Sequence, residues 1–350
     1  MAIILHERYA KDVEKKFTLD SIVAGKTANK YSFEGVKTVN IPTIITQPLN
    51  NYSRTGVNRY GVPQEVQDTM QSVTLEVDKS FALTVDKGNN TEQQAIKGAG
   101  TVLRVQMDEQ VIPAYDKRAF EQWTKFAGKV ATVNAALTAS TVYKEIIKAR
   151  THFVNSKINM KEGRFFLGVP ASVYELLLEN QHFIQADKLN AELLTNGVVG
   201  KIARMLVVEV PDEYLPTGVQ FIVWHADCVE APKKIWDTNL HMNPPGISGH
   251  LLEGRFIYDG FVLGEKANGV YALGLAASKL ATPTLSGTAL TCANATLIKY
   301  TNDGSDPRYS MTAKAYSQKV EGASGATIKA VGFADGKLTS DVMTATLTLS

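Results

Sequence analysis

The oxygen-bearing side chains best spaced to bind a metal ion lie in the run Asp303-Gly304-Ser305-Asp306. Carboxylate and hydroxyl oxygens are the hard ligands that Ca²⁺ prefers. The same run is also typical of a β-turn in which aspartate side chains accept hydrogen bonds from their own backbone. We favour the turn, so the sequence predicts no metal site at this position.

The other residue types that catalyse reactions are scattered along the chain. It contains no P-loop, no GxGxxG after a predicted strand, no HExxH and no GxSxG motif. No two carboxylates are expected in the contrasting environments that a general acid and a general base need. We therefore expect no catalytic, cofactor-binding or metal-binding residue. The histidines show no i, i+3 or i, i+4 pairing; they are His6, His152, His182, His225, His241 and His250.

Length, charge and cysteine content narrow the class of protein. The 350 residues suffice for two or three domains, and the formal net charge of +2 gives little long-range attraction for nucleic acid. The low net charge argues against a protein that recognises a specific DNA sequence. Cys228 and Cys292 fall in different predicted domains without CxxC spacing, so we expect both to be reduced. We expect no signal peptide, and no apolar run reaches the roughly 20 residues of a membrane-spanning helix.

The elements that must position any site are organised around residues 164–210. The apolar run Arg164–Val169 predicts a buried strand that ends at Pro170, and Pro170 starts a helix over Val173–Glu179. A second amphipathic element is expected over Phe183–Leu189. Asn196-Gly197 and Gly200 are expected to supply the positive φ angles of a turn into a strand over 205–210.

The N-terminal half is expected to contain an arm, a projecting loop and a long helix. Residues 1–30 are polar, with weak helical periodicity. Alternating segments at 36–41 and 73–78 flank a connection over Pro42–Gln71 that is too long for a hairpin turn, which indicates a projecting two-stranded arm. The arm mixes basic and aromatic residues as a nucleic-acid contact does, but we favour a contact between subunits. These residues are Tyr52, Arg54, Arg59 and Tyr60.

Helical periodicity recurs over residues 91–127 and again from Ser140 or Thr141 to Phe153, within a second helical region over 129–160. Pro113 is expected to kink the first helix or to split it in two. A helix of this length must run across one face of the molecule as a spine. Further strands are predicted at 220–225, at 249–263 with a bend near Gly254, and at 270–273.

The composition changes near residue 281. From there to residue 350 short alternating runs are separated by turn residues such as Asn302-Asp303-Gly304 and Asp335-Gly336, which predicts a small β-sandwich. The expected organisation is therefore an arm (1–30), an extended β-loop with peripheral strands (31–90), a helix-and-sheet body (91–280) and an all-β tail (281–350).

The body resembles the major capsid proteins of tailed bacteriophages with the Hong Kong 97-type fold. The resemblance lies in the strand, proline and helix at 167–177, in Phe183–Asp187 with Asn196–Ile202, and in the strands at 223–229 and 254–263. Residues 1–127 match only in the order arm, extended loop, long helix. At Ala203-Arg204-Met205 the sequence departs from the pattern, because a glycine is expected there.

The tail has a resemblance of its own. Ile298–Pro307, which contains Tyr-Thr-Asn-Asp-Gly-Ser-Asp-Pro, and Thr327–Lys337 resemble the immunoglobulin-like domain at the C-terminus of chitobiases and many surface proteins. In capsid proteins such a domain implies a decoration that faces outward. It also implies sugar binding or cell-surface adhesion as the role of the tail, with a surface glycan as its ligand.

Together the resemblances imply an α+β chain: a Hong Kong 97-type capsid fold, with N-arm, extended loop, spine helix, peripheral and axial domains, plus a small immunoglobulin-like sandwich. The implied function is a non-enzymatic head protein that forms hexamers and pentamers in an icosahedral virion shell around double-stranded DNA, assembled in the host cytoplasm. Portal and a separate scaffolding protein are the implied partners, with weak, non-specific DNA contacts and no membrane.

Two alternatives remain at this point. One is an encapsulin-type cellular compartment, which has the same fold. The other is a carbohydrate-binding or carbohydrate-active protein, suggested by the tail alone. If the tail is only a decoration, deletion of residues 281–350 should leave assembly intact.

Overall fold

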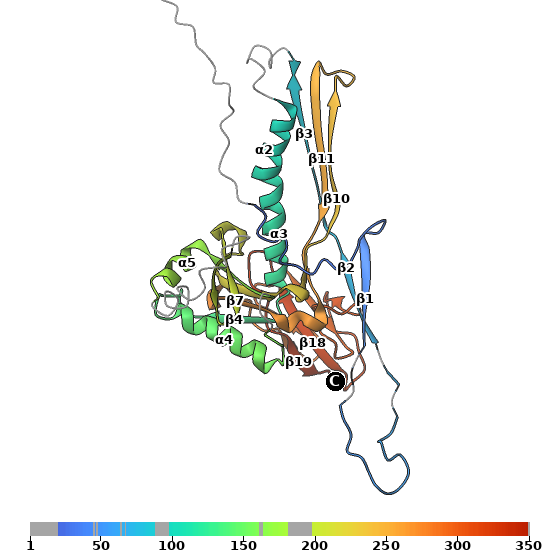
Figure 1. Ribbon diagram of the computed structural model, residues 1–350. Coiled ribbons are helices and arrows are strands. Elements are labelled where there is room, and N and C mark those ends of the chain that lie inside the picture. Colours follow the sequence, from blue (N-terminus) through green and yellow to red (C-terminus); the bar gives the residue numbers. More distant parts are fainter. Residues whose placement is uncertain are drawn as a thin grey trace, which may run out of the picture.

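The computed structural model describes residues 20–44, 46, 48–63, 65–66, 68–87, 98–160, 164–180 and 198–348. A central body of helices and strands carries two projections that point in opposite directions (Figure 1). One consists of a helix beside three long strands, and the other is the loop between β1 and β2. Among the described residues no helix combines the length and the apolar character needed to span a membrane.

The centre of the body is a sheet whose described strands follow the order β4-β13-β8-β5-β7-β6. β5 runs parallel to β7 and antiparallel to β8, and β13 runs parallel to β4. The predicted buried strand is confirmed as β5, and the strand at 205–210 as β7. The bounds are β4 Lys129–Val133, β5 Phe165–Pro170, β6 Val198–Ile202, β7 Met205–Val210, β8 Val219–His225 and β13 Val270–Leu275.

Alternate side chains of this sheet enter two different cores, as the two-residue period of a strand requires. Phe165 and Leu167 of β5 pack with α4 (Val142–Asn155) and α5 (Ala171–Leu178) on one face. Phe166 and Trp224 pack against the long helix on the other face. Because both faces are covered, β5 is apolar along its whole length and entirely buried.

The turn between β6 and β7 differs from the prediction. Gly200 lies within β6 without a positive φ, and the two connecting residues are Ala203 (φ 49°) and Arg204 (φ 73°). A two-residue hairpin with positive φ at both positions matches the twist of its strands. The pairing of Ile202 with Met205 therefore imposes a conformation that glycine normally adopts. Asn196-Gly197 and the element predicted at 183–189 lie outside the described residues.

The spine helix is confirmed, but Pro113 does not split it. α2 (Ala99–Gln106), a π-helical turn η1 (Met107–Val111) and α3 (Ile112–Lys125) follow one another as one rod (Figure 1). The backbone N–H of Ile112 donates to the carbonyl of Met107, five residues back. Pro113 lacks an N–H, so the wider π turn just before it lets the chain pass the ring. The start predicted at residue 91 lies outside the described residues.

The second helical region, predicted over 129–160, begins with a strand. Residues 129–133 form β4 at the sheet edge, and the helix itself is α4. β4 follows the spine helix almost directly. Residues 129–133 form a strand because they pair in parallel with β13, rather than because of their own short sequence.

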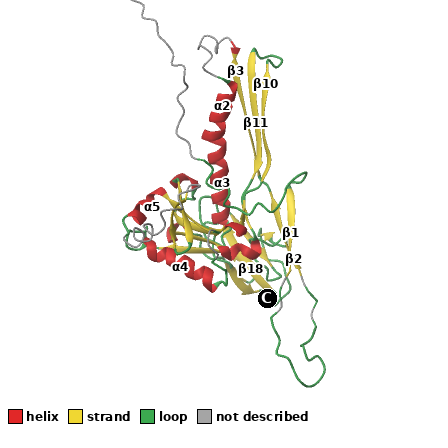
Figure 2. Ribbon diagram, viewed as in Figure 1, coloured by secondary structure: helices red, strands yellow, loops and turns green. Residues whose placement is uncertain are grey.

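The long projection places α2 beside a sheet in the order β10-β11-β3 (Figure 2). We expected one strand over 249–263 with a bend near Gly254. The structure keeps β11 in register with both neighbours through Gly254 and interrupts the chain at Asp259-Gly260 instead. A Cβ on Gly254 would lie 2.5 Å from the Phe81 ring, so the glycine makes room for that ring. The bounds are β3 Val77–Asp86, β10 Lys233–Met242, β11 Gly249–Tyr258 and β12 Phe261–Val262.

The predicted two-stranded arm is present as β1 (Thr38–Ile44) and β2 (Asp68–Thr74), paired antiparallel along their full length. The single strand predicted over 73–78 is wrong, because β2 ends at Thr74 and β3 begins at Val77. The tail forms a sheet in the order β17-β16-β18-β19 with a separate β14–β15 pair. We call residues 284–347 the C-terminal module. Its strands are β14 Thr284–Ser286, β15 Ala289–Thr291, β16 Leu297–Thr301, β17 Lys314–Ala315, β18 Thr327–Phe333 and β19 Met343–Thr346.

A substitution at Gly168 can test the packing between β5 and β8. A Cβ at this position would lie 2.9 Å from Trp224 Cζ3 and 3.2 Å from Ile222 Cγ2. We expect Gly168→Ala to lower the free energy of unfolding by about 1–3 kcal/mol, the usual cost of an overpacked core. Chemical denaturation of unassembled subunits measures this change.

Gly100→Ala is the matched control. Gly100 lies in α2, and nothing lies within 4 Å of its added Cβ. The same substitution should there raise the free energy of unfolding by about 0.5–1 kcal/mol, because alanine restricts the unfolded chain. Equal effects of the two substitutions would contradict the packing described for β5.

Candidate functional site

The loop between β1 and β2 is the most exposed apolar feature of the described chain. We call its residues 48–63 the projecting loop. Leu49 is fully exposed, and Val57, Tyr60 and Val62 are each more than 70% exposed. Apolar side chains gathered on a segment that stands away from the body mark an interaction surface. Each such aliphatic side chain gains about 1.5–3 kcal/mol when a partner removes it from water.

The tip of the projecting loop has internal structure. The backbone N–H of Ser53 donates to the carbonyl of Arg59 (2.9 Å), and Arg59 Nε donates to the carbonyl of Gly56 (3.3 Å). The Tyr52 and Tyr60 rings meet edge to face, with centroids 5.0 Å apart. The basic and aromatic residues singled out in the sequence are therefore gathered at one place. A preformed tip loses less conformational freedom when it binds.

The base of the loop is fixed to the body. Gln71 Nε2 donates to the carbonyl of Val262 (2.9 Å), and Gln71 Oε1 accepts from the N–H of Gly264 (2.8 Å). An apolar cluster below the hairpin holds it further. Its buried members are Phe33, Ile41, Val73, Leu75, Phe261 and Leu263. The body therefore presents the projecting loop as an arm in a defined direction.

The described part of the N-terminal segment is held by two buried carboxylates. Ser21 Oγ and the backbone N–H of Ile22 donate to Asp116 of α3 at 2.7 and 2.6 Å. The N–H of Lys30 donates to both oxygens of Glu230 at 3.0–3.1 Å. Residues 20–30 of the predicted arm thus lie on the body, and residues 1–19 lie outside the described part of the chain.

Burial raises the pKa of Asp116, and the hydrogen bonds from Ser21 and Ile22 offset only part of this rise. An acid whose pKa is higher in the folded than in the unfolded state binds its proton more tightly when folded. Its contribution to stability is therefore fully present below the unfolded value, about 4, and is lost as the pH rises through the folded value.

Asp116→Asn removes this titration. We expect the stability of the wild type, measured relative to the variant, to decrease as the pH is raised from about 4 to 7. Urea denaturation of unassembled subunits at a series of pH values measures it. Asp237→Asn, at an exposed position on β10, is the control for the loss of one negative charge. Parallel pH profiles for the wild type and Asp116→Asn would contradict the raised pKa of Asp116.

The carboxylates of the run considered for calcium interact with nearby residues of the C-terminal module. Asp303 Oδ1 accepts from the N–H of Ser305 (2.9 Å), and its Oδ2 accepts from Thr312 Oγ1 (2.6 Å). Asp306 instead pairs with Arg308 (2.7 Å). Among the described residues no group of three or more His, Cys, Asp or Glu is placed to hold a metal ion.

The two cysteines are free, as predicted, and lie in separate environments. Burial raises the pKa of Cys228 to about 12, so this thiol is unreactive near neutral pH. Cys292 lies in the C-terminal module, where its Sγ lies 3.2 Å from the carbonyl oxygen of Ala281.

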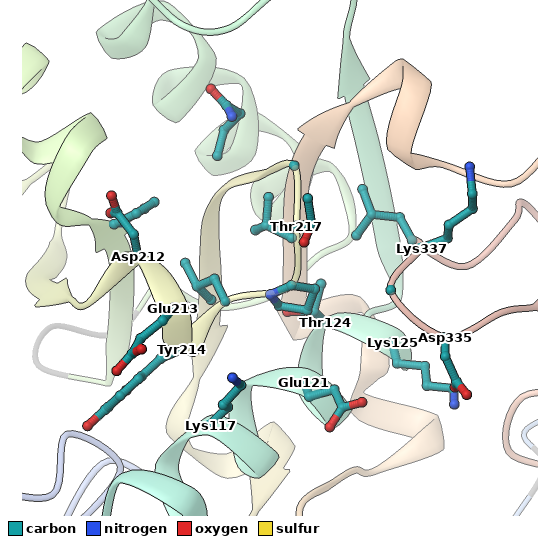
Figure 3. A pocket seen from close by; sticks show the side chains of 18 of the residues that line it. Lys117, Glu121, Thr124, Lys125, Asp212, Glu213, Tyr214, Thr217, Asp335 and Lys337 are labelled. Carbon is teal, nitrogen blue, oxygen red and sulfur yellow. The ribbon is translucent and has the colours of Figure 1, made fainter.

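A cavity of about 590 Å³ lies where the body meets the C-terminal module. Its walls carry charges of both signs. Figure 3 shows Lys117 and Glu121 of α3 below, residues 212–214 on the left, and Asp335 and Lys337 of the module on the right. The labelled residues are Lys117, Glu121, Thr124, Lys125, Asp212, Glu213, Tyr214, Thr217, Asp335 and Lys337.

Each aromatic ring of the described C-terminal module packs against other residues. Tyr300 and Tyr316 pack in or against the module's own core, and Phe333 and Tyr309 pack against the body. No aromatic residue of the described module is thus left as an exposed platform for a sugar ring. The glycan suggested by the tail's resemblance stays a prediction.

Comparison with solved structures relates the chain to phage particles. A structure of Mycobacterium phage Che8 is 17% identical, with 77% of this chain and 96% of that chain covered and a TM-score of 0.57. The capsid of cyanophage P-SCSP1u is 12% identical, with 78% and 93% covered and a TM-score of 0.62. The mature capsid of bacteriophage PhiM1 is 14% identical, with 78% and 92% covered and a TM-score of 0.59.

These likenesses establish the fold, and the capsid fold predicted from residues 160–275 is confirmed. The family described as Fn3 associated matches residues 288–347, which agrees with the immunoglobulin-like module predicted for the tail. A comparison with curated protein sequences found no match.

Proposed function

We propose that this chain is the major capsid protein of a tailed bacteriophage and that its function is self-assembly. Many copies form hexamers and pentamers, which close into an icosahedral shell around double-stranded DNA. Assembly takes place in the host cytoplasm with a portal and a separate scaffolding protein. The chain itself performs no chemical reaction. Its contacts with DNA are weak and non-specific, in keeping with a net charge of only +2.

The observation that carries this proposal is the projecting loop on a capsid fold. A segment with a preformed tip, a fixed base and largely exposed apolar side chains is costly in a monomer and useful only against another surface. In a shell of identical subunits that surface belongs to a second copy. Such an interface between copies is expected to bury well over 1,000 Å² in total.

The first test is whether the protein forms shells. We expect purified protein to form closed particles of uniform size, seen by sedimentation velocity and negative-stain electron microscopy. Only monomers or small oligomers under all conditions, including addition of a co-expressed scaffolding protein, would contradict the proposal.

The second test uses the projecting loop. Leu49→Glu with Val57→Glu should raise the protein concentration needed for shells at least tenfold, since 1.4 kcal/mol per contact already gives that factor. Both side chains are exposed, so the melting temperature of the unassembled subunit should stay unchanged. Leu49→Met with Val57→Ile keeps the apolar surface and should assemble as the wild type does. Normal assembly of the glutamate variant would exclude this loop as a contact.

A further inference from the structure

The C-terminal module covers the end of the spine helix. The last carbonyl groups of a helix have no partners within it and need donors from elsewhere. Thr339 Oγ1 donates to the carbonyl of Lys125 (2.6 Å), and the Tyr309 hydroxyl donates to that of Phe126 (2.6 Å). Arg308 Nη1 donates to the carbonyls of Ala127 (2.8 Å) and Gly128 (3.3 Å). The module thus supplies donors to four consecutive carbonyls where the helix ends.

Arg308 is well suited to this position. Its guanidinium is held by Asp306, with Nη2 to Oδ2 at 2.7 Å and Nε to Oδ1 at 3.1 Å. Its side chain is only 13% exposed. A fixed positive charge beside a helix C-terminus interacts favourably with the helix dipole. The guanidinium therefore joins the two parts by charge as well as by hydrogen bonds.

Apolar contacts fasten the same junction. Leu338 is 1% exposed and belongs to the core of the body that contains Trp123 and Trp224. It lies so close to Gly274 of β13 that a Cβ there would overlap its Cδ1. Phe333 packs on Phe126, with centroids 5.7 Å apart. A module attached only through a flexible linker would have none of these contacts.

The same short run of the module also reaches the base of the projecting loop. Tyr309 packs against Gly264, whose N–H donates to Gln71 in β2. The N–H of Met311 donates to the carbonyl of Met70, also in β2, at 3.0 Å. Residues 308–311 thus touch the end of the spine helix and the base of the loop at once.

We infer that the C-terminal module is an internal brace, which fixes the end of the spine helix and the base of the projecting loop relative to each other. This role goes beyond an outward-facing decoration. It reverses the expectation that removal of residues 281–350 leaves assembly intact. The part of the inference that concerns shells rests on the proposed function, whereas the part that concerns the loop base does not.

Hydrogen exchange of unassembled subunits, read by mass spectrometry, tests the brace directly. We expect Arg308→Ala to increase exchange at least tenfold in peptides that cover 68–74 and 120–128. Peptides from α4 should be unchanged, which shows that the body remains folded. Arg308→Lys keeps the charge but not the forked geometry and should have a smaller effect at the same peptides. Lys314→Ala, which removes one positive charge from an exposed ion pair within the module, should exchange as the wild type does.

Shell formation by the same variants completes the test. We expect Arg308→Ala to need at least tenfold more protein to form shells, and Lys314→Ala to match the wild type. If Arg308→Ala keeps wild-type exchange at 68–74, or assembles normally, the brace is refuted. If the wild type itself forms no shells, the proposed function fails, while the exchange measurement still decides whether the module fixes the loop base.

Discussion

The rest of the structure depends on the packing of Trp224 between the central sheet and the spine helix. Its ring lies 5.5 Å from Trp123, 5.7 Å from Phe120 and 5.6 Å from Phe166, centroid to centroid. Its indole N–H donates to the carbonyl of Lys26 (3.1 Å) and so holds the N-terminal segment as well. Large aromatic side chains contribute most of the packing energy of such a core. Residues from the N-terminal segment, helix, sheets and C-terminal module all enter this one cluster.

This central cluster allows other parts of the chain to remain unburied. The projecting loop carries apolar side chains into solvent, a cost that the body must offset. The brace and the Gln71 contacts fix the direction of that loop. In the proposed assembly this direction sets which surface of a second copy the loop meets. On this account the function depends on how the projecting loop is oriented relative to the body. Among the described residues no group of three or more His, Cys, Asp or Glu is placed to hold a metal ion.

Much of the body could be predicted from local sequence. The apolar run before Pro170, the stripe of the spine helix and the polar stretch after β1 each follow from the period or composition of a few residues. The π turn before Pro113 and the positive φ of Ala203 and Arg204 could not be predicted, because tertiary packing imposes them. The docking of Arg308 was also missed. Its acceptors are backbone carbonyls about 180 residues away. Every residue has such a carbonyl, so the residue type does not show which carbonyl accepts a hydrogen bond. An arginine directly after the Asp-Pro of the module was the only available signal.

A reconstruction of the assembled particle by electron cryo-microscopy, at a resolution that resolves side chains, tests the central claim most directly. The account predicts a closed shell in which residues 48–63 of each subunit lie on a neighbouring copy, with Leu49 and Val57 buried in that contact. It also predicts that residues 308–311 remain on β2 and on the end of α3 of the same subunit. A particle in which the loop faces solvent in every subunit, or the absence of any shell, would contradict it.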